Sequence, residues 1–476
     1  MFLFRMGVGR FLGRYFYVNQ FVASCSRRSL FVYNRAAQPS LGYSAPKRSA
    51  VVPVSTAVAA TMAAAATAAA AAGAGAVVYE STVSKPVRAE DIPEDAARLP
   101  HHVKDSSGNH VKFRNPYPSA GDPKPTMFQT LRAILTAKIQ GNLPTPSTSE
   151  AQIPCCTPQF SPSRDNAGGS GSLRATWLGH ACYYVEFPSG LRVLFDPVFE
   201  DRCAPVQWMG PKRYTQPPCK LAELPVVDAV VISHSHYDHL SYHSIKEIQT
   251  HHPSAWFFVG LGLEKWFKAS GVENVVEMDW WTDVKLTLTP QGDNNKGERE
   301  GRSIEAEISC LPCQHSSGRN GLDHDRTLWA SWGVKSGGKN VWFGGDTGYR
   351  RVPQLPVTQW KDPAADYGPE YESLPKCPQF KQIGERKGPF DLGLIPIGAY
   401  HPRWLFSWMH ANPYDAVEIF KDTRCARAMG IHWGTWVLTS EEVEEPPRLL
   451  RDALRQSGIE EEGVFGVCKI GETKEF

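Results

Sequence analysis

The sequence predicts an α/β fold in which two mixed β-sheets lie between layers of helices. From about Leu173 onward, short segments with the apolar spacing of strands alternate with helical segments. The first strands, residues 174–187 and 191–195, flank a Pro-Ser-Gly turn and form a predicted hairpin. Mixed strands with interspersed helices are typical of two sheets that share one core and carry helices on their outer faces.

The remaining elements follow in order along the chain. After the hairpin, we expect strands at residues 226–233, 255–259, 285–289, 305–310, 328–335, 340–343, 391–397 and 430–432. Helices are expected at residues 242–251, at 262–270, after Asn412, and at 447–457. Asn412 is a good N-cap because its side chain accepts from the first turn, and Pro413 suits the first helical position. These elements predict one large domain, residues 171–476.

The first 49 residues have a composition of their own. They contain eight Arg or Lys residues and no acidic residue, with many Ser and aromatic residues among them. This composition is typical of a mitochondrial or plastid transit peptide. The rest of the chain has 43 basic and 49 acidic residues, a net charge of −6, which argues against a nucleic-acid partner. We therefore predict import into the mitochondrion, with a plastid or other organelle as the alternative.

Two further segments precede the predicted domain. Residues 50–79 carry no charge and are rich in alanine, so they form either a low-complexity linker or a membrane anchor, with the inner membrane as one destination. Residues 80–170 are rich in Pro, Ser and charged residues and are expected to be a linker. Within it, residues 125–140 have apolar side chains at helical spacing, which predicts a short amphipathic helix that docks on the domain or contacts lipid.

The eleven cysteines have no repeating spacing, and Cys310 and Cys313 form the single CxxC pair. A zinc ribbon requires a second such pair. We therefore expect free thiols in a reducing compartment.

The segment Ser-His-Ser-His-Tyr-Asp-His-Leu at residues 233–240 follows directly on an apolar strand. His234 and His236 are two residues apart, so on an extended backbone their side chains share a face. Asp238 and His239 come where the chain turns toward the next helix, which directs them to a second, neighbouring position. Imidazole and carboxylate ligands together suit Zn²⁺ and tolerate iron or manganese. This segment therefore predicts a metal site.

Three more candidate ligands follow predicted strands elsewhere in the chain. His315 comes after the strand at 305–310, and His432 ends the strand at 430–432. Asp346 lies in a Gly-Gly-Asp-Thr-Gly turn, where glycine allows the backbone to approach a metal closely. Taken singly, each side chain is more often structural. Together with the first motif, they indicate a site with two metals.

These motifs resemble those of the metallo-β-lactamase superfamily and, within it, of the family of N-acylphosphatidylethanolamine-hydrolysing phospholipases D. The first motif alone marks only the superfamily, whereas the five stretches together are more specific. They are Thr176-Trp177-Leu178-Gly179-His180-Ala181, His234 to Leu240, Pro312-Cys313-Gln314-His315, Gly345-Asp346-Thr347-Gly348-Tyr349 and Ile431-His432-Trp433-Gly434-Thr435. The resemblance covers about residues 173–471 and implies the αββα sandwich of that superfamily for a catalytic domain at 171–476.

The resemblance also implies a ligand set for two zinc ions. One zinc would be held by His234, His236 and His315; the other by Asp238, His239 and His432; Asp346 would bridge them. Two neighbouring zinc ions lower the pKa of a shared water, so that hydroxide forms near neutral pH. The implied reaction is hydrolysis of N-acylphosphatidylethanolamine to phosphatidic acid and an N-acylethanolamine, with Asp238, Asp346 and His410 in catalytic positions.

His410 is similar in position to an active-site histidine of the family, which implies a contact with the phosphate or the leaving oxygen. The alternative is a histidine at a helix start that bonds only to backbone. An aromatic cluster precedes it, made of Tyr400, Trp404, Phe406 and Trp408 with Met409. Such a density of aromatic residues predicts an apolar mouth for acyl chains, in which Trp404, Trp408, Met409 and His410 contact substrate. His180 is expected to support the ligands rather than to bind metal.

The expected partners are a membrane phospholipid and the membrane surface, and a homodimer stays open. One alternative function is hydrolysis of another ester, a lactone, a thioester or an RNA phosphodiester, because fold and metal ligands do not fix the substrate. Another is a mononuclear iron oxygenase, or a protein that keeps the fold for membrane organisation. Two polar inserts, residues 291–303 and 351–390, are expected to influence the acyl and head-group preference.

Overall fold

The computed structural model describes residues 77–121, 127–162, 164, 171–291 and 302–476, apart from 142, 144, 150, 357, 358, 360, 361 and 363. Of the described residues, those within 81–289 and 303–476 form one compact unit, and residues 77–80, 290, 291 and 302 belong to a second. The expected transit peptide, nearly all of the alanine-rich segment and most of the insert at 291–303 lie outside the described residues. The elements described below belong to the larger unit, except for the ends of two paired strands.

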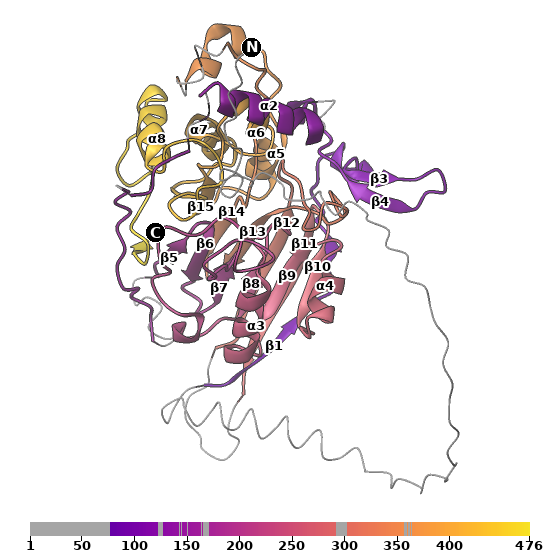
Figure 1. Ribbon diagram of the computed structural model, residues 1–476. Coiled ribbons are helices and arrows are strands. Elements are labelled where there is room, and N and C mark those ends of the chain that lie inside the picture. Colours follow the sequence, from indigo (N-terminus) through magenta and orange to yellow (C-terminus); the bar gives the residue numbers. More distant parts are fainter. Residues whose placement is uncertain are drawn as a thin grey trace, which may run out of the picture. The chain divides into compact units, whose positions relative to one another are not determined.

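The first sheet has antiparallel strands at one side and parallel strands at the other (Figure 1). Its order is β1–β11–β12–β13–β14–β15–β16–β17, and β2 also pairs with β11. The strands are β1 (Tyr79–Val83), β2 (Val87–Arg88), β11 (Thr282–Pro290), β12 (Ile304–Leu311), β13 (Ser331–Ser336), β14 (Lys339–Phe343), β15 (Leu392–Pro396), β16 (Ala428–Ile431) and β17 (Phe465–Gly466). Pairing is antiparallel from β11 to β14 and parallel from β14 to β17, so β12, β14 and β16 end at the same edge.

The second sheet has the order β10–β9–β8–β7–β6–β5–β18. Its strands are β5 (Arg174–Gly179), β6 (Cys182–Glu186), β7 (Arg192–Phe195), β8 (Ala229–Val231), β9 (Trp256–Gly260), β10 (Val275–Met278) and β18 (Thr473–Glu475). Pairing is parallel from β7 to β10 and antiparallel from β7 to β18. A separate hairpin consists of β3 (His102–Lys104) and β4 (His110–Phe113).

The two sheets pack face to face because their central strands are apolar on both sides. Phe195 of β7 and Phe343 of β14 meet between the sheets, with ring centroids 4.8 Å apart. On the other face of the second sheet, Tyr184 and Leu194 join the cluster of buried side chains that contains Ile245 and Phe267 of the neighbouring helices. Continuous apolar runs are what strands buried on both faces require.

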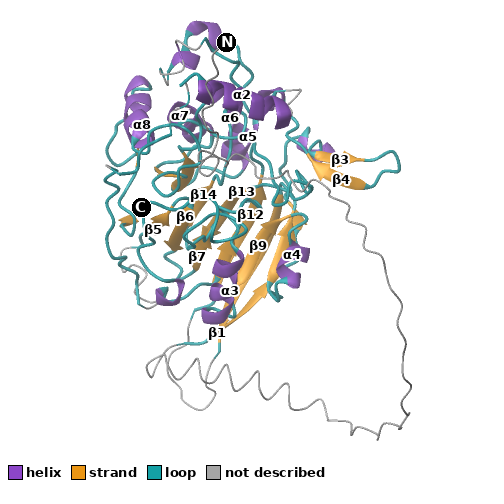
Figure 2. Ribbon diagram, viewed as in Figure 1, coloured by secondary structure: helices purple, strands orange, loops and turns teal. Residues whose placement is uncertain are grey.

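Helices cover the outer face of each sheet, and Figure 2 shows them beside the strands. The helices are α2 (Met127–Ile139), α3 (Tyr242–His251), α4 (Glu264–Ala269), α5 (Gln379–Arg386), α6 (Arg403–Phe406), α7 (Pro413–Asp422) and α8 (Glu445–Gln456), with short 3₁₀ turns at Ala96–Arg98, Pro118–Ala120, Leu221–Glu223, Ala365–Tyr367 and Pro369–Tyr371. The side-chain hydroxyl of Ser241 caps α3, and the side-chain carbonyl of Asn412 caps α7. This layered arrangement confirms the predicted αββα sandwich.

Several elements differ from the sequence-based expectation. The predicted strand at 174–187 is broken into β5 and β6 by a turn in which Gly179 and His180 have positive φ angles of 104° and 52°. In the expected linker at 80–170, the strands β1 and β2 pair within the first sheet, and α2 lies within the range predicted for the amphipathic helix. The insert at 351–390 was expected to be a surface loop, but it contains α5. This helix forms because its apolar residues are buried against the domain.

Within the described residues, no helix is both long and apolar enough to cross a membrane. The cysteines of that part of the chain are free thiols, as predicted. Cys310 and Cys313 are buried, and burial raises the pKa of both thiols well above its usual value. Since the reactive species is the thiolate, this CxxC pair is not suited to redox chemistry.

Candidate metal centre

The candidate site lies where several strands of the two sheets end. Asp196 follows β7, the His-rich segment follows β8, and His432 follows β16. His315 and Asp346 come a few residues after β12 and β14, whose ends share an edge with that of β16. The carboxyl ends of neighbouring parallel strands are the usual place for a functional site in an α/β sheet.

Three histidines form one group of converging nitrogens. Nε2 of His234 lies 2.8 Å from Nδ1 of His236, and Nε2 of His315 lies 3.2 Å from the same Nδ1. The ligand atoms of all three lie within 4.8 Å of one another. Three imidazole nitrogens at this spacing match three corners of a tetrahedral metal site.

A second group combines a carboxylate with two histidines. Oδ2 of Asp238 lies 3.5 Å from Nε2 of His239 and 3.4 Å from Nε2 of His432. His432 has a positive φ of 64°, a strained backbone for a non-glycine residue that places its ring among the others. This group therefore offers a second position with mixed nitrogen and oxygen ligands.

Asp346 lies between the two groups. Its Oδ2 is 3.8 Å from Nε2 of His234 and 3.1 Å from Nε2 of His239, and its Oδ1 is 3.1 Å from Nε2 of His432. Gly345, with φ +57°, permits this approach, since a Cβ there would stand 2.5 Å from the Cβ of Ser233. One carboxylate thus reaches both candidate positions, as a bridging ligand must.

The residues fit a bound cation better than a closed hydrogen-bond network. Three inward atoms, Nε2 of His239, Nε2 of His432 and Oδ1 of Asp346, are buried without a hydrogen-bond partner. Buried polar atoms without a partner are costly, and a divalent metal at their common centre removes that cost. Imidazole nitrogens and carboxylate oxygens are the donors that Zn²⁺ and related divalent ions accept.

The outward nitrogens of two ligands, His239 and His315, are held by hydrogen bonds. His239 donates from Nδ1 to Oδ2 of Asp196 at 2.6 Å, and His315 donates from Nδ1 to the carbonyl of Met409 at 2.8 Å. Asp196 also accepts from the backbone amide of Ser233 at 2.7 Å. Bonds of this kind fix the tautomer and leave Nε2 free for the metal.

Electrostatics favour the metal-binding form at some of the ligands but not at all of them. At His239 and His432 burial lowers the pKa, but Asp346 and Asp238 outweigh it and raise the pKa, so a cation that binds there displaces a proton. Burial disfavours the charged form of Asp346, yet His239 and His432 outweigh it and hold the pKa of this carboxyl well below its usual value. Burial lowers the pKa of His234 and of His315 well below the usual value, so both are neutral and keep a free lone pair. Neutral imidazole and ionised carboxylate are the metal-binding forms.

His410 lies beside the two groups, just before the N-terminus of α7. Its Nδ1 is buried without a hydrogen-bond partner and is 4.0 Å from Oδ2 of Asp346. Its ring centroid is 5.0 Å from that of His315, and burial lowers the pKa of His410 to about 3. The structure therefore places His410 at the site as a neutral imidazole, without the ordinary backbone bond of a helix-start histidine.

His180 contacts the second group from the turn between β5 and β6. Its Nε2 lies 3.2 Å from Oδ2 of Asp238, and its ring centroid is 4.1 Å from that of His432. Burial lowers the pKa of His180 to about 3. The ligand atoms of His180, Asp238, His239 and His432 all lie within 4.8 Å of one another, so the expected supporting role of His180, as opposed to metal binding, stays a prediction.

Most side chains of the aromatic cluster before His410 are buried, whereas side chains that line a mouth open to solvent would be exposed. Phe406 and Trp408 are buried, whereas Trp404 and Met409 are half-buried. Tyr400 is also buried, and its hydroxyl donates to Glu445 of α8 at 2.7 Å. Tyr400 thus belongs to the core, and substrate contact through Trp404, Trp408 and Met409 stays a prediction.

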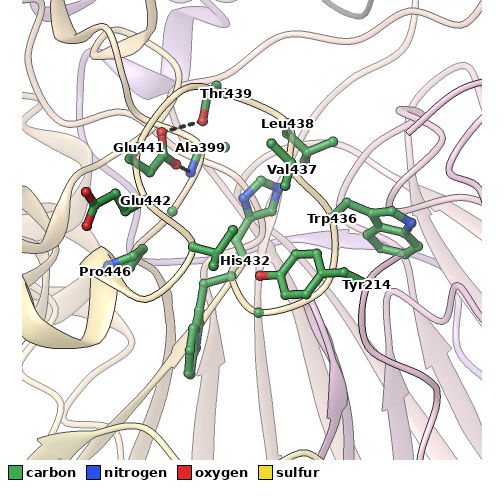
Figure 3. A pocket seen from close by; sticks show the side chains of 14 residues that line it. Tyr214, Ala399, His432, Trp436, Val437, Leu438, Thr439, Glu441, Glu442 and Pro446 are labelled. Carbon is green, nitrogen blue, oxygen red and sulfur yellow. Dashed lines mark hydrogen bonds between the residues drawn. The ribbon is translucent and has the colours of Figure 1, made fainter. Parts of the chain in front are cut away.

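A small cavity adjoins His432 on the loop that follows β16 (Figure 3). It is lined by Tyr214, Gly398, Ala399, His432, Trp433, Gly434, Trp436, Val437, Leu438, Thr439, Glu441, Glu442, Val443 and Pro446. Its volume is about 30 Å³, which suits a water rather than a lipid. Glu441 closes one side by accepting from the amide of Ala399 at 2.6 Å.

A buried charge network, not foreseen from the sequence, connects the loops around the site. Arg350, four residues after Asp346, pairs with Asp415 of α7 at 3.2 Å and with Asp366 of the 351–390 insert at 3.3 Å. Arg403 of α6 pairs with the same two carboxylates at 2.6 and 2.9 Å. Two positive and two negative side chains thus hold together the segments that carry Asp346 and His410.

Arg319 was also missed, because only the fold brings it to the His-rich segment. Its Nη1 donates to the carbonyls of Ser235 and Leu240, each at 2.8 Å, so it holds the two ends of the segment that carries His236, Asp238 and His239. The guanidinium also lies 3.9 Å from the ring of Tyr237. The planar, multi-donor group of arginine is suited to holding two carbonyls and an aromatic face together.

We expect Arg319→Lys to weaken metal binding by about 10- to 100-fold, because a lysine does not reproduce the fork and the stacking that hold the motif. Competition with a chelator, followed by elemental analysis, measures the change. Arg326→Lys, an exposed arginine of the same loop, is the matched control and should bind metal as the wild type does. Equal affinity in Arg319→Lys and the control would remove this role.

Comparison with known proteins agrees with the fold. A family model described as beta-lactamase superfamily domain matches residues 191–359 and 367–433, a span that includes all seven candidate ligands and His410. The N-acyl-phosphatidylethanolamine-hydrolyzing phospholipase D 1 of Caenorhabditis elegans is 36% identical over 68% of this chain and 81% of its own length. An uncharacterised protein of Mycobacterium tuberculosis is 35% identical over 64% of this chain and 70% of its own.

A further relative is the mitochondrial N-acyl-phosphatidylethanolamine-hydrolyzing phospholipase D of Saccharomyces cerevisiae, 32% identical over 62% of this chain and 55% of its own length. The fold and the converging ligands define a metal-dependent hydrolase. The chain belongs to the metallo-β-lactamase superfamily and, within it, to the family of these N-acylphosphatidylethanolamine-hydrolysing phospholipases D. The resemblance predicted from the five sequence motifs is thereby confirmed.

Proposed function

We propose that this protein is a zinc-dependent phospholipase D with two zinc ions per chain, which hydrolyses N-acylphosphatidylethanolamine to phosphatidic acid and an N-acylethanolamine. The observation that carries the proposal is the position of Asp346 between two groups of imidazoles, within 3.1 Å of both His239 and His432 and 3.6 Å of His315. The names of the nematode and yeast relatives support the choice of substrate.

In this proposal, His234, His236 and His315 hold one ion, and Asp238, His239 and His432 hold the other. When bound, two zinc ions lower the pKa of a water and neutralise charge on the phosphoryl oxygens. Asp346 fixes the spacing of the two positions. His410 presents a neutral imidazole beside them, where it contacts the phosphate or the oxygen that leaves.

The substrate reaches the site from a membrane surface in this account. In this proposal Trp404 and Met409, which are half-buried and precede His410 in the sequence, contact the acyl chains. On α2, Leu135 and Ile139 are one helical turn apart and are 56% and 78% exposed, which supports contact with lipid. A homodimer is compatible with the proposal but is not needed for it.

We also propose a mitochondrial location. The acid-free, arginine-rich residues 1–49 have the composition of a transit peptide, and the name of the yeast relative includes the mitochondrion. A fusion of residues 1–80 to a fluorescent protein tests this directly. Location in another organelle would contradict the proposal.

The reaction is tested by incubating the purified protein with N-acylphosphatidylethanolamine micelles in ¹⁸O-labelled water. Cleavage of the bond between phosphorus and the head-group oxygen puts the label in phosphatidic acid, and the released N-acylethanolamine carries an unlabelled hydroxyl. Mass spectrometry distinguishes this from hydrolysis at an acyl ester, which labels a fatty acid. A label absent from phosphatidic acid contradicts the phospholipase D assignment.

Two control arms separate the rival functions. A panel of plain phosphatidylethanolamine, a lactone, a thioester and RNA tests other hydrolyses of the same fold. Elemental analysis tests the oxygenase, which would carry one iron per chain. Chelation should abolish turnover and added Zn²⁺ should restore it. Turnover that survives chelation would contradict a metal-dependent reaction.

A further inference from the structure

A second cluster of metal-ligating side chains lies away from the residues of the candidate centre. His101 and His102 stand at the start of β3, at the base of the β3–β4 hairpin that is labelled in Figure 1. Asp279 directly follows β10 and precedes β11. The cluster therefore connects the hairpin to the junction between the two sheets, and it shares no residue with the seven ligands described above.

Both histidines aim at one carboxylate. Nε2 of His101 lies 2.8 Å from Oδ1 of Asp279, and Nε2 of His102 lies 2.8 Å from Oδ2. The three ligand atoms lie within 4.8 Å of one another. The ring of His110, on β4, has its centroid 5.0 Å from that of His102 and stands beside the same group. The cluster thus combines two adjacent residues at the start of one strand with a third residue from a turn that is distant in the sequence.

The charge of Asp279 has no ordinary counterion. Its side chain is only 18% exposed, and within the described residues no lysine or arginine forms an ion pair with it. A carboxylate whose side-chain partners are two imidazoles thus lies in a poorly hydrated place, where a cation shared by the three groups would compensate its negative charge.

The surroundings are those of a structural metal site. The ring of His101 stacks on Trp280 at 4.2 Å, and the ring of His102 meets Phe113 at 5.1 Å. Phe113 is 2% exposed and Trp280 is 3% exposed, so an apolar shell excludes water on this side. Two imidazoles and a carboxylate, with His110 or a water at the fourth position, are a ligand set that Zn²⁺ accepts.

We propose that His101, His102 and Asp279 bind a divalent transition-metal ion, Zn²⁺, at a structural site separate from the catalytic pair. The ion clamps the hairpin base to the turn after β10. The chain then continues from the hairpin to Asn115, whose Nδ2 donates to the carbonyl of His315 at 2.8 Å and whose Oδ1 accepts from the amide of His315 at 3.2 Å. The clamp thus steadies a segment that supports one catalytic ligand.

The test compares Zn²⁺ stoichiometry in full-length wild type, His102→Gln and Asp279→Asn. Each protein is loaded with Zn²⁺, dialysed against metal-free buffer and measured by elemental analysis. We expect each variant to lose one equivalent of Zn²⁺ per chain relative to the wild type. His251→Gln, an exposed histidine of α3, is the matched control and should lose none. Equal stoichiometry in all four proteins would overturn the proposal and leave a cluster held by hydrogen bonds alone.

A second measurement covers the case in which a variant does not fold. Crystals of the wild type are measured on either side of the zinc absorption edge. An anomalous peak between His101, His102 and Asp279 supports the site, and its absence from crystals grown with Zn²⁺ refutes it. Because this readout needs no turnover, its result is independent of whether the proposed lipid hydrolysis is correct.

Discussion

Asp346→Asn should lower hydrolysis by at least about a thousandfold, which corresponds to roughly 4 kcal/mol in the activation barrier. The carboxylate of Asp346 reaches both sets of imidazoles, at 3.8 Å from His234 and 3.1 Å from His432. An asparagine keeps the size of the side chain but carries no charge and offers a single oxygen. It cannot bridge two cations, so their spacing and the charge at the reacting centre are lost.

Steady-state rates with N-acylphosphatidylethanolamine and metal content per chain should be measured together. The fold should be retained, as judged by circular dichroism, because the substitution removes no core packing. The matched control is Asp452→Asn, a partly exposed carboxylate of α8 whose partner is Arg455; it should keep full activity. Wild-type turnover in Asp346→Asn would show that this carboxylate is not a ligand.

Arg403→Leu should destabilise the domain by about 3–5 kcal/mol, because it leaves a buried carboxylate without its partner. Arg403 is 7% exposed and contacts Asp366 and Asp415, which are both nearly inaccessible to water. Burial raises the pKa of a carboxyl, but Arg403 and Arg350 hold the pKa of Asp415 below its usual value. Since Arg350 alone then faces two carboxylates, one negative charge stays unbalanced in the interior.

Thermal unfolding at one fixed scan rate measures the effect, with an expected fall in apparent Tm on the order of 5–15 °C. Arg455→Leu is the control, since its side chain is 67% exposed and its ion pairs are at the surface; its Tm should change little. Activity should fall as well, because the network joins the segments of Asp346 and His410. A Tm equal to that of the control would mean that the network contributes nothing to stability.

The ligand residues were predictable because each one follows a strand and because their chemistry is recognisable in the sequence. His234, His236, Asp238 and His239 lie within six residues, so their proximity is a local property. His315, Asp346 and His432 are far apart in sequence, but parallel strand ends meet at one edge of a sheet, and the three do converge. The resemblance to a known family supplied their division between two metals.

The supporting residues were not predictable from the sequence, because their role depends on tertiary contacts. Asp196 ends β7 as an ordinary aspartate, and only the neighbouring β8 brings Ser233 and His239 to it. Arg319 lies in a polar loop with no motif. The 351–390 insert was expected to be a surface loop, yet Asp366 within it forms ion pairs with two buried arginines. Ion pairs between residues that are distant in the sequence cannot be recognised from local composition.

Strand boundaries were predicted less well than strand positions. Residues 174–187 have apolar side chains on both sides of His180, so no change of periodicity marks the turn there that separates β5 from β6. Similarly, the strands β1 and β2 arise in a segment rich in Pro and charged residues, where pairing with β11 and not local propensity determines the structure.

Anomalous diffraction at the zinc edge tests the existence of a catalytic metal pair most directly. If the account is right, two peaks appear about 3.5–4 Å apart, one surrounded by His234, His236 and His315, the other by Asp238, His239 and His432, with Asp346 between them. A single iron peak in this place, or no peak among these side chains, would contradict it.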